Sequence, residues 1–186
     1  SEYIARSAYT TTGYLSSTVT SLDSRKMTLV ACMKNTVANE FWLMHGLRSG
    51  SDKIRVKSLT SGFNVSLNDA SATLIGSIES TTVMTVGDWY TVLICFDGDN
   101  QAGSKLYING SSNSTTSGFT SANNIQYSTM DSITMMAENT NNRGDGNISS
   151  IYFTTDYIDF SLESERNKFV NQLNFPRQLD GLIADG

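Results

Sequence analysis

The segment that decides the fold covers residues 87–110 and reads GDWYTVLICFDGDNQAGSKLYING. Its apolar run, Trp89 to Phe96, is rich in β-branched and aromatic residues, which favour a β-strand over a helix. An acidic, glycine-containing loop at 97–103 separates this run from a second, shorter one at 105–108. Asn109-Gly110 then supplies residues that tolerate the positive φ of a tight turn. The segment therefore predicts two strands joined by a polar loop, near the middle of an all-β domain.

The same segment resembles the central signature of laminin-G-like and concanavalin A-like jelly-roll domains. The likeness lies in Trp89, in Phe-Asp-Gly at 96–98 and in Leu-Tyr-Ile-Asn-Gly at 106–110, and it continues in GNISSIYF at 146–153, which resembles a late strand of that fold. Downstream, residues 157–176 resemble the C-terminal sequences of such domains in tailed-phage structural proteins. The resemblance implies an antiparallel two-sheet sandwich, a fold that carries lectins, glycosidases and interaction modules, and so it implies no single function.

Composition bounds the class of protein. The chain has 186 residues, of which 39% are hydrophobic and 17% charged. This length and composition predict one domain over 1–186 with a sizeable core. The net charge of −5 argues against nucleic acid as a partner, because phosphate binding needs a basic face. A membrane partner is not expected either, since no apolar run approaches the about 20 residues of a membrane helix.

Alternation along the chain predicts the strands and their faces. The run at 27–33 is apolar on both alternating sides, as in a central strand. The runs at 54–57 and 63–67 alternate apolar with polar residues, so each is expected to turn one face to solvent. Residues 3–5 predict a first short strand, which the resemblance to jelly rolls places beside the last one, and 111–124 predict a long loop or a weak hairpin. In all we expect about ten to twelve short strands.

One helix is predicted from Leu162 to about Leu173. Ser161 is expected to cap its first turn, and Leu162, Phe169 and Leu173 fall on one face at helical spacing. Pro176 prevents its continuation. We expect the helix to pack on the sandwich through this apolar stripe.

The two cysteines, Cys32 and Cys95, lie inside strand-like apolar runs. Two interpretations are open: buried reduced thiols that behave as small hydrophobic residues, or a disulfide across the sandwich. The first is favoured, because scaffolds that depend on disulfides are usually smaller and denser in cysteine. Neither cysteine has a CxxC partner, so zinc is not indicated.

No catalytic motif is apparent, and the protein is predicted not to be an enzyme. Glycosidases on this fold carry clustered acids on one strand, and no such strand is present. A Ser-His-acid triad would need His45, the single histidine, which has no nucleophile motif nearby. His45 is therefore expected to have a structural role.

Calcium is the candidate cofactor. The resemblance implies it, because related domains often bind calcium in loops at one rim, and two loops of this chain are rich in oxygen ligands. Asp97, Asp99 and Asn100 form one oxygen-rich loop, and Asn142 and Asp145 lie in a second. Calcium takes six to eight oxygen ligands, so the two loops would have to converge. The alternative is that Asp, Asn and Gly are there because they make turns.

Two residues are candidates for contact with a glycan. Tyr127 lies beside a polar loop, where its ring is expected to face a ligand, and Asn141 lies in the second polar loop. Loops rich in hydroxyls and amides with few charges suit glycan recognition. Trp89 and Tyr107, by contrast, belong to the strand signature and are expected to pack.

Two functional hypotheses from different classes follow. The first is a non-catalytic virion structural protein of a tailed phage, as a capsid decoration or a tail or fibre module, present in many copies and bound to other capsid or tail proteins. It depends on the C-terminal resemblance and on the lack of a catalytic set and of a signal-peptide pattern. The alternative is a secreted, extracellular carbohydrate-binding module or lectin for cell-surface glycans, with or without calcium; a glycoside hydrolase ranks third.

Overall fold

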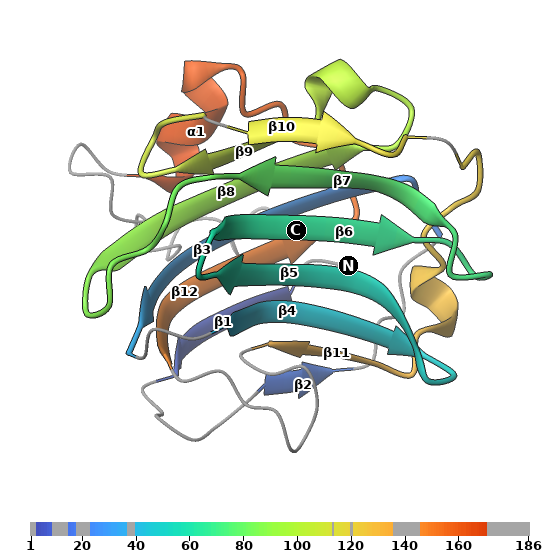
Figure 1. The fold of residues 1–186 in the computed structure, drawn as a ribbon, viewed down its shortest axis with the longest axis horizontal. Helices are drawn as coiled ribbons and strands as arrows, with labels where there is room; N and C mark the ends of the chain where they lie inside the picture. The colour runs from blue at the N-terminus through green and yellow to red at the C-terminus, as the bar shows by residue number, and fades with distance from the viewer. Residues whose placement is uncertain are drawn as a thin grey trace.

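The computed structural model describes residues 23–36, 40–112, 114–119, 121–135 and 146–170, together with the backbone of β1 (Tyr3–Ala8) and β2 (Leu15–Ser17). These residues form two stacked antiparallel sheets (Figure 1). The five-stranded sheet has the order β1, β12 (Gly146–Thr154), β3 (Lys26–Asn35), β8 (Trp89–Asp97) and β9 (Lys105–Ile108). The seven-stranded sheet has the order β10 (Ser114–Ser117), β7 (Leu74–Ser80), β6 (Gly62–Asn68), β5 (Ser51–Leu59), β4 (Phe41–Arg48), β11 (Ser132–Met135) and β2. The predicted jelly-roll sandwich is confirmed.

The segment at 87–110 folds as its sequence predicts. Strands β8 and β9 pair antiparallel, with Val92 opposite Ile108, and the short 3-10 helix η1 (Gln101–Gly103) lies in the loop between them. Asn109 and Gly110 have φ values of 51° and 80°, the left-handed conformation that made this pair a turn signal. The first predicted strand also lies where expected, because β1 pairs with β12.

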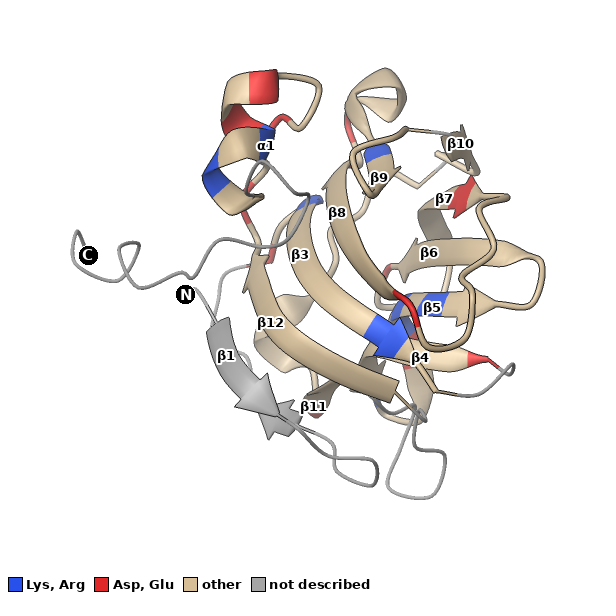
Figure 2. Ribbon diagram, turned by 90° about the vertical axis from the view of Figure 1, so that its left-hand side faces the viewer, with Lys and Arg blue, Asp and Glu red and all other residues tan. Residues whose placement is uncertain are grey.

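The main core lies between the sheets, and its composition follows from alternation. Phe63, Val65 and Leu67 are buried in it, as the pattern of β6 predicts. Arg55 and Lys57 of β5 are on the opposite, outer face of the seven-stranded sheet. Figure 2 shows β12, β3 and β8 side by side, with charged residues confined to the strand ends, as suits central strands that are covered on both faces.

A second apolar cluster lies on the outer face of the five-stranded sheet, under helix α1 (Glu163–Phe169). The ring centroid of Phe169 lies 5.1 Å from that of Tyr152 and 5.7 Å from that of Phe160. The guanidinium of Arg166 lies 5.0 Å from the centroid of the Tyr107 ring. The helix therefore packs on the sandwich as predicted, and Phe169 is the member of the predicted apolar stripe that makes the contact.

The predicted bounds and cap of this helix were wrong. Val170 is extended, with φ −122° and ψ 134°, so the helix ends at Phe169, and residues 171–173 lie outside the described part of the chain. Val170 is β-branched and buried against the second cluster, which favours this early end. Ser161 does not cap the helix; Leu162 occupies the N-cap and is 52% exposed, so it is not part of the packed stripe.

The sequence left two interpretations of residues 111–124 open, a long loop or a weak hairpin. In the structure this segment contributes the edge strand β10, which pairs with β7. Two 3-10 turns complete the described elements, η1 and η2 (Tyr127–Thr129). Within the described residues, none of the helices combines the length and the apolar character that a membrane crossing requires. The assignment of residues 1–186 to one domain stays a prediction.

Both cysteines are buried free thiols, which confirms the favoured interpretation. In the β3–β8 register Cys32 is opposite Thr91 and Cys95 is opposite Thr28, so the two cysteines are four positions apart along the strands, about 13 Å. A disulfide needs Cα atoms within about 7 Å, so this pair cannot form one without a large rearrangement.

We expect neither thiol to react in the folded protein, because burial raises the pKa of both Cys32 and Cys95 and keeps them protonated. Mass spectrometry after alkylation at pH 8 should show no adduct on the native protein and two adducts after unfolding in urea without a reductant. A cross-linked peptide in a non-reducing digest would contradict the assignment.

Candidate functional site

A line of side chains crosses the outer face of the seven-stranded sheet. Trp42, Lys57, Asn64, Glu79 and Thr115 are directly opposite one another in register on β4, β5, β6, β7 and β10. Residues that face each other on adjacent strands point to the same side of a sheet. At about 4.8 Å between strands, this cross-strand row extends about 19 Å over the sheet.

The row divides into a covered end and an accessible end. The Lys57 ammonium lies 4.8 Å from the centroid of the Trp42 ring and 2.9 Å from Oε2 of Glu40. Trp42 is only 7% exposed, so it is a platform for Lys57 and offers little surface for stacking a ligand. Asn64 is half-buried, whereas Glu79 and Thr115 are exposed. The end of the row on β6, β7 and β10 is therefore the part that a ligand can reach.

A second polar row lies beside the first and is internally hydrogen-bonded. His45, Arg55, Ser66, Ser77 and Ser117 are opposite one another on β4, β5, β6, β7 and β10. Arg55 Nε donates to Ser66 Oγ at 3.0 Å, and the hydroxyls of Ser77 and Ser117 are 2.8 Å apart. In this second polar row, these side chains therefore hydrogen-bond to one another.

His45 is the buried member of the second polar row at its β4 end. Its Nε2 lies 2.8 Å from Oδ1 of Asp52, and its ring lies edge-on to Trp42, with centroids 5.1 Å apart. The residue is 3% exposed. This placement agrees with the structural role predicted for it.

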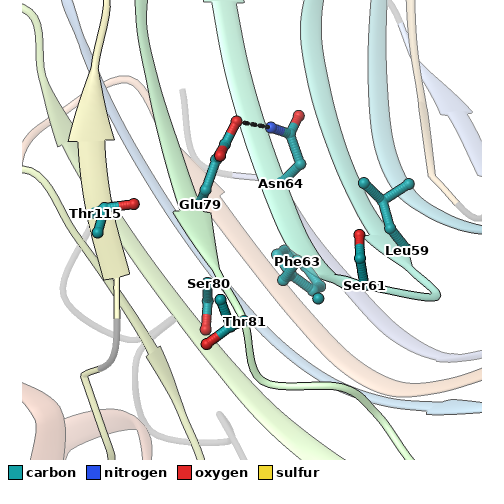
Figure 3. A pocket seen from close by; sticks show the side chains of 9 residues that line it. Leu59, Ser61, Phe63, Asn64, Glu79, Ser80, Thr81 and Thr115 are labelled. Atoms are coloured by element: carbon teal, nitrogen blue, oxygen red, sulfur yellow. Dashed lines mark hydrogen bonds between the residues drawn. The ribbon is translucent and has the colours of Figure 1, made fainter.

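The accessible end of the cross-strand row opens into a hollow of about 510 Å³. This volume is in the range of small-molecule sites. In Figure 3, Glu79 and Asn64 lie between β7 and β6, with Thr115 on β10 to one side and the hairpin residues Leu59 and Ser61 to the other. The full lining is Leu59, Ser61, Gly62, Phe63, Asn64, Glu79, Ser80, Thr81 and Thr115.

The polar groups of the lining are hydroxyls, one amide and one carboxylate, and they lie beside a larger apolar surface. Asn64 Nδ2 donates to Glu79 Oε1 at 3.2 Å, so each of these side chains orients the other. Ser61, Thr81 and Thr115 contribute hydroxyls that can donate or accept, and Leu59 adds apolar surface. Such a set suits a ligand that carries several hydroxyl groups on a partly apolar frame.

The loop predicted to bind calcium uses its oxygens within the protein. Asp97 Oδ1 accepts from the N–H of Asp99 at 3.0 Å, and Asn100 Oδ1 accepts from the N–H of Gly103 at 3.1 Å. Asp99 Oδ1 accepts from Arg25 Nε at 2.7 Å. The cation that this loop contacts is thus a guanidinium, and one side-chain oxygen of each of the three residues already accepts a hydrogen bond within the protein.

No group of three or more His, Cys, Asp or Glu side chains suited to a metal occurs among the described residues. Asn142 and Asp145, which the prediction placed in the second calcium loop, lie outside those residues, as does the glycan candidate Asn141. Calcium binding therefore stays a prediction without support from the described loop.

Tyr127 was wrongly predicted to face a ligand. Its side chain is fully buried, its hydroxyl donates to the backbone carbonyl of Lys26 at 2.9 Å, and its ring packs near Phe153. Burial raises the pKa of the phenol well above its usual value. The 3-10 turn η2 directs this side chain into the core, which the polar sequence around it does not reveal.

Sequence reasoning missed Asn64, Glu79 and Thr115 as site residues. One signal was available for Asn64, because the alternation of β6 places it on the face opposite Phe63 and Val65. Its juxtaposition with Glu79 and Thr115 depends on strand order and register, and local sequence does not encode these.

No protein-family model matches this chain, and no curated protein matches its sequence. Solved structures do share its fold. A heptameric SAP-like pentraxin from Limulus polyphemus is 16% identical with a TM-score of 0.60, over 84% of this chain and 76% of the pentraxin. The CBM40 of the Ruminococcus gnavus IT-sialidase, bound to α2,3 sialyllactose, is 15% identical with a TM-score of 0.57, over 79% and 94%.

The ligand binding domain of botulinum neurotoxin serotype D, in complex with N-acetylneuraminic acid, is 12% identical with a TM-score of 0.55. The match covers 83% of this chain but only 41% of the toxin domain. At these identities the likeness concerns the fold alone. The chain therefore shares the two-sheet jelly-roll architecture of these domains.

Proposed function

We propose that this chain is a non-catalytic glycan-binding domain whose ligand occupies the hollow on the seven-stranded sheet. One observation carries the proposal: the cross-strand row brings an amide, a carboxylate and a hydroxyl from three adjacent strands to one hollow of about 510 Å³. Sites built on strands hold their polar groups in place before the ligand arrives, which limits the entropy lost on binding. Structures of the same fold in complex with N-acetylneuraminic acid and with α2,3 sialyllactose support a glycan as the ligand class.

The lining favours binding over hydrolysis. Both mechanisms of glycoside hydrolysis use a pair of carboxylates about 5–10 Å apart across the scissile bond. Among the described residues that line the hollow, Glu79 is the single carboxylate. The proposed domain therefore holds a glycan without cleaving it. A place on a virion or in the extracellular space stays a prediction, which co-purification with intact virions tests.

The Asn64→Ala variant tests the site. We expect a glycan array to identify ligands for the wild-type protein, and calorimetry with the best of them to show about tenfold weaker binding by the variant, because the amide is lost and Glu79 loses its orienting bond. The Asn147→Ala variant is the matched control, since Asn147 is also half-buried but lies on β12 of the other sheet. An array without hits, or equal losses in both variants, would overturn the proposal.

A further inference from the structure

We infer that the hollow selects uncharged polyhydroxylated glycans and discriminates against sugars that carry a carboxylate. The inference rests on the proposed function and specifies its ligand class. It depends on the charge of the lining: among the described residues that line the hollow, Glu79 is the single charged one. From the described lining residues a ligand meets one negative charge and no positive one.

The carboxylate of Glu79 is oriented as an acceptor. Its Oε1 receives the hydrogen bond from Asn64 Nδ2, and no described residue donates to Oε2. An ionised carboxylate has no proton to donate and can accept from two oxygens at once, so two neighbouring hydroxyls of a sugar match it. A ligand carboxylate is also ionised at neutral pH. It has no proton to give to Glu79, and the two like charges repel.

The nearby cationic side chains do not offset the negative charge of Glu79 in the hollow. Lys57 lies next to Asn64 in the cross-strand row, but its ammonium is 2.9 Å from Glu40 Oε2 and stacked on Trp42. Arg55 in the second row lies 3.8 Å from Asp52 Oδ2. Each of these positive charges therefore already lies within 4 Å of a carboxylate, and neither side chain lines the hollow.

The test compares each uncharged glycan with its carboxylate-bearing counterpart, for example lactose with sialyllactose and galactotriose with trigalacturonate. We expect the wild-type protein to bind the uncharged member of the pairs it recognises about tenfold more tightly at low ionic strength. Because Glu79 is exposed, the ratio should fall as salt is added.

The Glu79→Gln variant removes the charge and keeps the shape. We expect it to bind the uncharged glycan more weakly and to lose the discrimination against the acidic counterpart. Glu163→Gln, at an exposed position on α1, is the charge-matched control and should change neither value. Tighter binding of acidic glycans by the wild type, or an unchanged ratio in Glu79→Gln, would overturn the inference but leave the glycan-binding proposal standing. Absence of any glycan binding would overturn both.

Discussion

Replacing Gly62 with alanine is expected to lower the free energy of unfolding by about 3–5 kcal/mol, the largest effect of any exchange considered in this protein. Gly62 closes the β5–β6 hairpin with φ +145°, a backbone conformation that residues with a side chain rarely adopt. A Cβ atom at this position would overlap the backbone carbonyl oxygen of Ser80 on the neighbouring strand β7. Because that atom belongs to the backbone, relief requires the two strands to move apart.

Gly50→Ala separates this steric effect from the effect of a positive φ. Gly50 lies at the turn between β4 and β5 with φ +74°, and a Cβ there would meet no atom within 4 Å. We expect it to cost only about 1 kcal/mol. Urea denaturation of both variants gives the comparison. Equal losses would show that the approach of Gly62 to Ser80 is unimportant for stability.

The second large effect is expected for Asp69→Asn, at about 3 kcal/mol. Asp69 is 1% exposed and accepts four hydrogen bonds. Its Oδ1 accepts from the N–H groups of Ser71 and Thr73, both at 2.9 Å, and its Oδ2 accepts from Ser121 Oγ at 3.1 Å and Asn123 Nδ2 at 2.7 Å. Asparagine would present an NH₂ group to one of these pairs of donors. The loop after β6 would then lose either the two hydrogen bonds that hold its own turn or its attachment to the 121–123 segment.

The effect should depend on pH. Burial by itself would raise the pKa of Asp69, but the hydrogen bonds from Asn123, Thr73, Ser121 and Ser71 outweigh it and hold the pKa below its usual value. A depressed folded-state pKa stabilises the protein above the unfolded value, about 3.9, and this contribution is lost as the pH falls through the folded-state pKa.

The difference in unfolding free energy between wild type and Asp69→Asn should therefore be constant from pH 7 to 5 and shrink below about pH 4. Asp88→Asn, in an exposed turn, is the control and should cost less than about 0.5 kcal/mol at every pH. A loss for Asp69→Asn that stayed constant down to pH 2 would contradict the role of the charge.

The strands and their inward and outward faces could be predicted from the sequence, because side chains alternate every two residues and this pattern involves only neighbouring positions. Two-residue alternation is enough to place Phe63, Val65 and Leu67 inward, and Asn109-Gly110 is enough to predict a tight turn. The helix was predicted less well. Its apolar stripe was visible, but its end at Phe169 depends on how Val170 packs against the second cluster.

The polar sites needed contacts between distant segments. Arg25 donates from Nη1 to the carbonyl oxygens of Ser121 at 2.8 Å and of Asn123 at 2.7 Å, and it also binds Asp99. These partners are more than 70 residues away in the chain. The oxygens of this loop were predicted as calcium ligands, and no local pattern shows that Arg25, in the bend just before β3, already binds one of them.

The sequence by itself determined an all-β sandwich, the inward and outward faces of its main strands, and a helix packed against it, because each of these follows from residues a few positions apart. Only the tertiary structure decided which outward side chains meet. Asn64, Glu79 and Thr115 come together because β6, β7 and β10 are neighbours in one register, and strand order is set by packing of the whole core. A site assembled across strands is therefore a property of the folded sheet.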